Sequence, residues 1–312
     1  MKLSIVIPCY NEEKVIRETH GRLQRLQAKW VDSGLIEDYE VIYVDDGSED
    51  STLDILKELT HESKKVKVST FSNNFGHQAA LTAGLCHSNG DAVISLDADL
   101  QDPPQVMESM IHEFRKGNEV VFGVRRNRDE DTLFKRFTAE TFYKLMQIMG
   151  VKCIYNHADY RLLSKRVIVE FRRYSEVNRF LRGMIPLMGF RHTIVEYDRD
   201  KRYAGETKYP FRKMLAFAIE GITSFSSTPL RLISIFGCVL FIGTLLLSCW
   251  ALVMTLFGAT VPGWASTVLP TYFLGGVQLM FLGVVGEYVG RIYMEVKHRP
   301  IYIIKEKYNY ED

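Results

Sequence analysis

The chain has 312 residues, of which 46% are hydrophobic and 25% charged, and its 39 Lys and Arg residues balance 38 Asp and Glu residues to a net charge of +1. This composition excludes an intrinsically disordered chain, and the charge balance argues against a general nucleic-acid binder, which has a strongly basic surface. The five cysteines form no CxxC pair and no Cys/His cluster, so neither a zinc site nor a disulfide framework is indicated. The length predicts two domains, or one domain with an appendage.

Short apolar runs alternate with amphipathic segments over residues 1–123. The apolar runs are rich in β-branched residues and predict buried strands at 3–7, 41–44, 66–71, 92–96 and 119–122. Helical patterns lie between them, near 12–29, 51–61, 77–88 and 104–116. Strands that alternate with helices predict an α/β fold with a mainly parallel sheet. The apolar run at the N-terminus is too short for a signal peptide, so we expect this part to be cytosolic.

Polar clusters follow the predicted strands, at 8–13, 45–51, 73–76, 97–102 and 125–128. Ligands bind parallel sheets at the carboxyl ends of the strands. We therefore expect a ligand site at this edge of the sheet.

The C-terminal third predicts a membrane domain. From Leu232 to Gly286, 55 consecutive residues include no Asp, Glu, Lys, Arg or His. Two spans, near 232–257 and 267–289, each exceed the ~20 residues that cross a bilayer. Basic residues flank them on the outer sides, so the positive-inside rule predicts cytosolic termini. Glu287 and Arg291 are expected to form an i, i+4 pair at the interface.

Two further helical patterns lie outside these spans. Residues 132–149 predict an amphipathic helix, and Phe211–Phe225 predicts another, which fits a helix in the membrane interface as well as an ordinary domain helix. The resulting plan has four parts: a cytosolic domain at 1–205, an amphipathic juxtamembrane segment at 206–231, two transmembrane helices at 232–290 and a cytosolic basic tail at 291–312.

Asp97 and Asp99 follow the fourth strand at positions i and i+2, with Gln101 beyond them. Two carboxylates at this spacing can approach one divalent cation, and hard oxygen ligands suit Mg²⁺ or Mn²⁺ that holds a diphosphate. Acidic pairs also cap helices, and we assign that role to Asp102, which precedes two prolines. The sequence therefore predicts a metal and diphosphate site at Asp97 and Asp99.

Two more clusters complete the expected site. Tyr10 offers a ring on which a base can stack, and Glu12 offers a carboxylate near the ribose. Of Asp45 and Asp46, one can accept a hydrogen bond from a base or ribose while the other holds the turn. Each cluster alone is also explained as turn chemistry. Together with Asp97 and Asp99 they outline a nucleotide-diphosphate site.

These motifs resemble family 2 glycosyltransferases of the GT-A fold. The resemblance rests on the runs 5–13, 44–52 and 97–104. Within the family, the chain most specifically resembles the polyprenyl-phosphate glycosyltransferases, such as dolichol-phosphate mannose synthases and bactoprenol glucosyltransferases. It covers the whole chain, including the two C-terminal spans. The QxxRW motif of processive synthases is absent from the region 178–183, which argues against a polymerising enzyme.

The resemblance implies roles for individual residues. The residues that cradle the nucleoside would be Pro8, Tyr10, Glu12, Val44 and Asp46. Those at the metal and diphosphate would be Asp97, Asp99 and Gln101, with the backbone of Ala98 beside them. The phosphate-binding residues would be Arg125, Arg136, Arg202 and Lys208. The catalytic residues would be Asp159, Asp99 and Arg202.

Asp159 matches the position of the proposed catalytic base, but its acceptor would be a phosphate monoester with a second pKa of about 6. We expect Asp159 to orient a cation or a sugar hydroxyl instead. A lone histidine is more often structural, so for His77 we expect the backbone amide at a helix N-terminus to matter more than the ring.

The expected activity is metal-dependent, inverting transfer of one sugar from a nucleotide-diphosphate sugar, with UDP-glucose as the first candidate, to undecaprenyl phosphate. The reaction would occur at the cytosolic face of the plasma membrane. A GDP-mannose or amino-sugar donor, a non-catalytic scaffold of the same fold, and homo-oligomerisation stay open.

Overall fold

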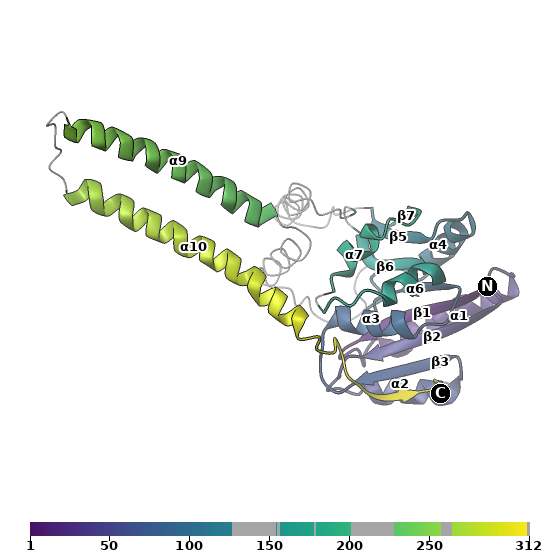
Figure 1. The fold of residues 1–312 in the computed structure, drawn as a ribbon. Coiled ribbons are helices and arrows are strands. Elements are labelled where there is room, and N and C mark those ends of the chain that lie inside the picture. The colour runs from purple at the N-terminus through teal and green to yellow at the C-terminus, as the bar shows by residue number, and fades with distance from the viewer. Residues whose placement is uncertain (127–153, 155–156, 178, 201–227, 257–263, 311–312) are drawn as a thin grey trace.

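The computed structural model describes residues 1–126, 154, 157–177, 179–200, 228–256 and 264–310. These residues form an α/β body from which two long helices project (Figure 1). The helices expected at 132–149 and 211–225 lie outside the described residues, as do Arg136, Arg202 and Lys208.

The body is built on an eight-stranded sheet with the order β7-β5-β6-β4-β1-β2-β3-β8. The strands are β1 (Lys2–Cys9), β2 (Asp38–Asp45), β3 (Val66–Phe71), β4 (Ala92–Ser95), β5 (Val120–Arg125), β6 (His157–Ser164), β7 (His192–Tyr197) and β8 (Ile304–Tyr308). β6 and β8 run antiparallel to their neighbours, whereas the other pairings are parallel. The five predicted strands and the mainly parallel sheet are confirmed.

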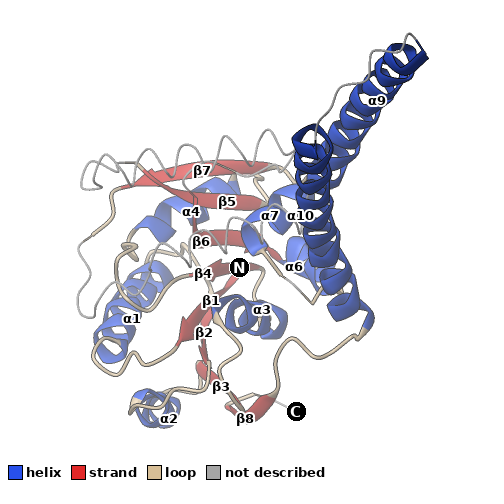
Figure 2. Cartoon of the chain, turned by 90° about the vertical axis from the view of Figure 1, so that its left-hand side faces the viewer, coloured by secondary structure: helices blue, strands red, loops and turns tan. Residues whose placement is uncertain are grey.

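Helices cover both faces of this sheet (Figure 2). On one face α1 (Ile16–Asp32), α2 (Thr52–Glu62) and α4 (Val106–Arg115) pack against the sheet, and on the other α3 (His77–His87), α6 (Lys165–Arg172) and α7 (Leu181–Leu187) do so. Alternate residues of β1 serve the two cores, with Ile5 and Ile7 on one side and Val6 on the other. The two-faced burial explains the continuous apolar runs of the strands.

The first helix begins four residues later than predicted. The backbone N–H groups of Glu12 and Glu13 donate to the side chains of Thr52 and Asp50, at 2.8 and 3.3 Å. These contacts hold residues 12–15 in turns next to the β2–α2 connection. The acidic segment therefore belongs to the edge of the sheet where the ligand site is expected.

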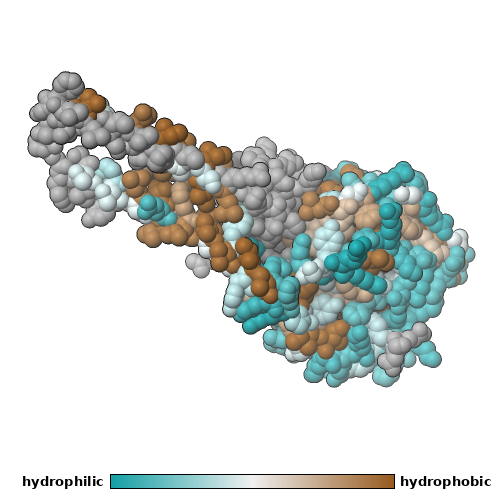
Figure 3. All heavy atoms as spheres, viewed as in Figure 1, coloured by the Kyte–Doolittle hydropathy of each residue, from teal (hydrophilic) through white to brown (hydrophobic). Residues whose placement is uncertain are grey.

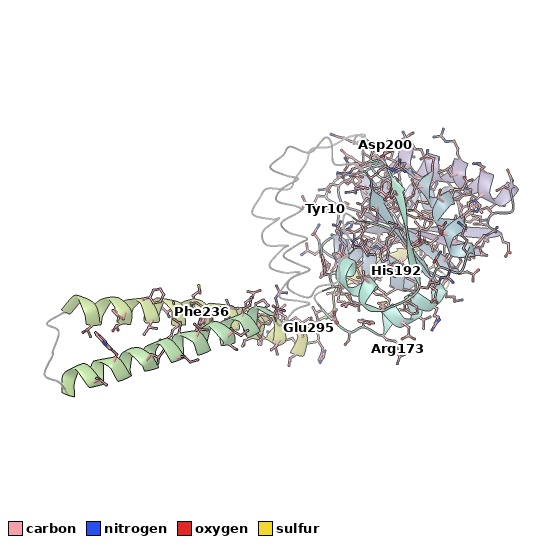
Figure 4. All side chains as sticks on the ribbon, turned by 90° about the horizontal axis from the view of Figure 1, so that it is seen from above. Tyr10, Arg173, His192, Asp200, Phe236 and Glu295 are labelled. Atoms are coloured by element: carbon pink, nitrogen blue, oxygen red, sulfur yellow. The ribbon has the colours of Figure 1, made fainter. Side chains whose placement is uncertain are left out.

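The long helices are α9 (Thr228–Leu256) and α10 (Trp264–Val296), which lie side by side in antiparallel directions (Figures 1 and 4). The rings of Phe236 and Phe281 meet edge to face across the pair, 5.8 Å apart. Large apolar side chains are exposed along both helices (Figure 3). Arg291 Nη2 lies 3.1 Å from Glu287 Oε1, which confirms the predicted pair.

One stretch of the described residues, Phe273–Val296, is long and apolar enough to cross a membrane, and none of it is buried. The two expected spans are thus two long helices, and their passage through a bilayer stays a prediction.

The strand β8 was not expected. Residues 304–308 lie in the segment that we predicted as a basic tail, yet they pair antiparallel with β3 at the edge of the sheet. The end of the chain therefore returns to the α/β body after the long helices (Figure 1).

Candidate active site

The expected site residues that the structure describes lie at one edge of the sheet, where β1, β2, β4 and β5 end. β6 runs antiparallel to β4, so it begins at the edge where β4 ends. Ser95 lies opposite Arg161 in this register, which brings Asp97 and Asp159 to facing positions two residues further on. Tyr10 lies on the side of the body from which the long helices project (Figure 4). β6 thus brings Asp159 to the edge of the sheet where the carboxylates predicted from the parallel strands lie.

The loops after β1 and β2 are joined by hydrogen bonds. The backbone N–H of Asn11 donates to Ser48 Oγ at 3.0 Å, and the N–H of Glu49 donates to Asn11 Oδ1 at 2.9 Å. Asn11 adopts a left-handed conformation with φ of 55°. Next to these hydrogen-bonded loops the ring of Tyr10 is 41% exposed, which leaves it accessible to a planar ligand.

Pro8 and Val44, which were expected to line the nucleoside, have buried side chains. Val44 is fully buried in the core, among residues that pack α3 against the sheet. Its side chain therefore shapes the core beneath the site, and contact with a nucleoside would come from its backbone.

Asp45 and Asp46 have different partners at the end of β2. Asp46 accepts hydrogen bonds from the backbone N–H groups of Phe75 and Gly76 at 2.7 and 2.9 Å. Burial raises the pKa of Asp46, and these two hydrogen bonds oppose the shift. Asp45 accepts from the Thr70 hydroxyl at 2.8 Å and from the N–H of Ser48 at 3.3 Å. Asp45 holds its own turn, and Asp46 holds the loop 73–77 against the site.

Asp97 and Asp99 fit a divalent cation. Oδ1 of Asp97 is buried and has no hydrogen-bond partner among the described residues, and burial raises the pKa of this carboxyl group. Asp99 is 9% exposed, and its Oδ1 accepts from the N–H of Gln101 at 3.1 Å. A buried carboxylate oxygen without a donor is satisfied by a cation.

Gln101 is placed differently from the two aspartates. Its side-chain oxygen accepts a hydrogen bond from the Arg199 guanidinium, and its carbonyl accepts the N–H of Asp200 at 2.9 Å. Within the described part of the chain no three His, Cys, Asp or Glu side chains form a ready metal cage. This agrees with the usual Mg²⁺ arrangement, in which one or two carboxylates share the ion with substrate phosphates.

We predicted that Asp102 caps the following helix, but the structure shows other partners for its side chain. Its carboxylate accepts from the Arg125 guanidinium at 3.0–3.1 Å and from the Tyr197 hydroxyl at 2.7 Å. Burial lowers the pKa of Arg125, but the Asp102 carboxylate outweighs it and the pKa is raised. Arg125 is thus held at the end of β5 by a partly buried ion pair, and its contact with a phosphate stays a prediction.

Asp159 lies at the centre of a charged cluster that also contains Arg161, Arg182 and His77. Its side chain accepts from Arg161 Nη2, and from Arg182 at 2.9 Å to Nη2 and 3.4 Å to Nε. His77 Nε2 lies 3.6 Å from both Asp159 Oδ2 and Asp97 Oδ1. Burial alone would raise the pKa of Asp159, but the two guanidinium groups lower it well below its usual value. The neighbouring arginines therefore favour the charged form of Asp159.

The ring of His77 takes part in this cluster, and our expectation that its backbone amide matters more stays a prediction. Burial lowers its pKa, but the nearby Asp97 and Asp159 carboxylates raise it above the ordinary value overall. His77 begins α3, directly after the two N–H groups that bind Asp46. The segment 75–77 thus touches the ends of β2, β4 and β6.

The partners of Asp159 were not predicted from the sequence. Arg161 stands two residues after Asp159 on β6, and at 1% exposure it is fully buried. Two of its nitrogens, Nε and Nη1, have no partner among the residues described. A charged residue inside an otherwise buried strand was the available signal, because such a residue needs a counter-charge.

The chain is similar to a protein family and to several named proteins. The model of "Glycosyl transferase family 2" matches residues 4–171. A Bacillus subtilis protein named "Uncharacterized glycosyltransferase YkoT" is 48% identical over 97% of this chain and 90% of its own length. The "Bactoprenol glucosyl transferase" of Shigella phage SfV is 40% identical over 98% of this chain and 99% of its own. The "Prophage bactoprenol glucosyl transferase homolog" of Escherichia coli K12 is 39% identical over the same shares.

Proposed function

The chain belongs to glycosyltransferase family 2, and from that premise we propose that it transfers one sugar from a nucleotide-diphosphate sugar to a polyprenyl phosphate. UDP-glucose is the first candidate donor, and the cytosolic face of the plasma membrane is the proposed location. The observation that carries the proposal is the match of nearly the whole chain, both long helices included, to proteins named bactoprenol glucosyl transferase.

The exposed apolar surface of α9 and α10 supports a membrane acceptor. Leu246, Trp250, Leu279 and Leu282 are each more than half exposed on these helices. Fully burying one such side chain in an apolar medium is worth about 1.5–3 kcal/mol, so the pair is stable only when lipid or protein covers it. A polyprenyl phosphate keeps its head group at the bilayer surface. An enzyme anchored there meets this substrate without extracting its tail.

The acidic edge of the sheet supports a nucleotide-diphosphate donor. The exposed ring of Tyr10 is suited to stack on a base, and Asp97 and Asp99 are suited to hold Mg²⁺ or Mn²⁺. Bound there, the ion would supply positive charge for the diphosphate leaving group. Asp46 supports this pocket indirectly, since its carboxylate is occupied by two backbone N–H groups.

The contacts of Asp159 support an organising role and not that of a general base. Both of its oxygens already accept hydrogen bonds from guanidinium groups. The acceptor phosphate, with a second pKa of about 6, is largely ionised at neutral pH and requires little deprotonation. In this proposal Asp159 fixes Arg182 and the His77 ring beside Asp97, where negative charge of the substrates gathers.

The test is transfer of radiolabelled sugar to lipid. The purified full chain is incubated with undecaprenyl phosphate, Mn²⁺ or Mg²⁺, and UDP-glucose, GDP-mannose or a UDP-amino sugar in separate reactions. We expect label from UDP-glucose in the chloroform phase, and none from an Asp99→Ala variant. Label transferred only from another donor would overturn the choice of sugar. If no donor gives label while a control enzyme is active in the same lipid, the polyprenyl acceptor is overturned.

A further inference from the structure

The last residues of the chain form a strap, residues 297–310, between the end of α10 and the edge of the sheet. Its strand β8 pairs with β3, with Thr70 opposite Glu306 and Phe71 opposite Ile304. The N–H of Ser72 extends this ladder to the carbonyl of Ile303 at 3.0 Å. Figure 1 shows the strap running from α10 to β3. Without it β3 would be the edge strand.

The far end of the strap is firmly anchored. Asn309 adopts a left-handed conformation with φ of 58°, and its Nδ2 lies 2.8 Å from the carbonyl of Thr60 and 2.9 Å from that of Val66. The Ser69 hydroxyl donates to Tyr310 Oη at 3.0 Å, and burial raises the pKa of Tyr310 to about 12. These contacts tie the end of the chain to α2 and β3.

The part of the strap next to α10 packs on Phe71, which in turn contacts the loop 73–77. The ring of Tyr302 stacks on Phe71, with centroids 5.0 Å apart and planes inclined by 7°. Phe71 in turn meets Phe75 edge to face at 5.8 Å. Phe75 is the residue whose N–H binds Asp46 at 2.7 Å. Three aromatic rings thus connect the strap to the loop 73–77.

A second contact fixes the start of the strap. The Glu295 carboxylate, in the last turn of α10, accepts the N–H of Val177 at 2.9 and 3.1 Å. The segment from Val177 leads to α7, whose Arg182 binds Asp159. The end of α10 therefore contacts the segment before α7, while the strap contacts Phe71 and β3.

We propose that the strap is a positioning device for the donor site, in which Tyr302 acts through Phe71 and Phe75 to hold the loop that carries the Asp46 contacts and His77. This inference rests on the proposed function for its donor. It makes the nucleotide pocket depend on the segment that follows the membrane helices. The competing explanation is that the strap only covers an exposed sheet edge.

The experiment uses the full chain in nanodiscs and compares Tyr302→Ala with Tyr302→Phe, which keeps the ring, and with Lys305→Ala, a change at an exposed residue of the same strap. Binding of UDP with Mn²⁺ is measured by calorimetry. An aromatic pair is worth about 0.5–1.5 kcal/mol, so we expect Tyr302→Ala to weaken UDP binding by about two- to tenfold. KM for the nucleotide sugar should rise while kcat stays near wild type, and both control variants should bind as wild type does.

Hydrogen exchange without nucleotide gives an independent measurement. Opening of the loop should accelerate exchange at the amides of Phe75 and Gly76 in Tyr302→Ala by a similar factor. If the alanine variant does not fold, Tyr302→Leu replaces it in the same measurement, because leucine keeps apolar volume but cannot stack on Phe71. A folded variant with wild-type exchange at these two amides would overturn the inference, as would an equal effect of Tyr302→Phe. A wild-type protein that binds no UDP would count against the proposed donor, and the exchange data would still decide on the strap.

Discussion

Replacing Asp159 with Asn removes the negative charge around which Arg161, Arg182 and His77 gather. Asp159 is 5% exposed and Arg161 is 1% exposed, so the arginine is left with no solvent in place of its counter-charge. Breaking a buried ion pair in this way costs about 3–5 kcal/mol. Asn keeps a carbonyl oxygen that can accept from one guanidinium, which places the expected loss near the lower limit, at about 3 kcal/mol. At about 2–4 °C per kcal/mol, Tm should fall by about 6–12 °C.

The same variant tests the role of Asp159 in the reaction. Its lowered pKa means that the carboxylate contributes its full stability above pH ~4 and loses it only as the pH falls through the lower folded-state value. Asp159 is therefore not the group behind an acidic limb of the rate profile near pH 6. His77, whose pKa the Asp97 and Asp159 carboxylates raise, also titrates in this region, and a limb that stays in place when Asp159 is replaced belongs to the acceptor phosphate. We expect Asp159→Asn to lose rate in kcat/KM measurements while this limb stays where it is.

Two results would refute this reasoning. A shift of the acidic limb by several pH units in Asp159→Asn would identify Asp159 as a proton acceptor in the reaction. An unchanged Tm would show that Arg161 does not depend on its partner. Asp32→Asn, at an exposed carboxylate near the end of α1, is the matched control and should keep both the wild-type Tm and the wild-type profile.

Three further predictions follow from the site. Asp99→Ala should remove more activity than Asp159→Asn, and EDTA should abolish a transfer that Mn²⁺ or Mg²⁺ restores; near-equal losses in the two variants would contradict the metal role. Burial and the nearby Arg161 lower the pKa of His157 to about 3, so the unfolded chain binds a proton below pH 6.5 that the native His157 does not. In urea unfolding, the free energy of unfolding of the wild type should fall by about 2 kcal/mol more than that of His157→Gln between pH 7 and pH 5. Equal decreases in the two proteins would contradict this prediction. Gly47→Ala should cost more than about 1 kcal/mol and weaken UDP binding, because Gly47 has φ of +70° and a Cβ there would lie 2.7 Å from the Asn73 carbonyl carbon; a thermal shift assay with and without UDP measures both, and an unchanged Tm would show that the loop adapts.

The N-terminal half of the fold was predictable because its signals are local. Each of the first four strands is an apolar run that ends in a polar cluster, and the parallel arrangement brings those clusters to one edge without any knowledge of distant contacts. Asp97 and Asp99 could be placed at this edge for the same reason, and their role as metal ligands stays a prediction.

The strand β8 could not be predicted in this way. Its sequence, Ile-Lys-Glu-Lys-Tyr, has three consecutive charged residues and is indistinguishable from a solvated tail. It becomes a strand because β3 offers an unpaired edge more than 230 residues earlier in the chain, with Val68 opposite Tyr308. The charged cluster of Asp159 also depends on such distant contacts, since His77 and Arg182 come from α3 and α7.

The position of β8 has a consequence for how the protein is made. Among the elements that the structure describes, seven strands and both long helices precede residues 304–308, so the ribosome makes them first. Domains generally fold as the chain emerges, so the nascent sheet waits with β3 unpaired while α9 and α10 leave the exit tunnel. A chain that stops before residue 304 thus keeps an open edge at β3, and this edge is covered only once residues 304–308 have been made.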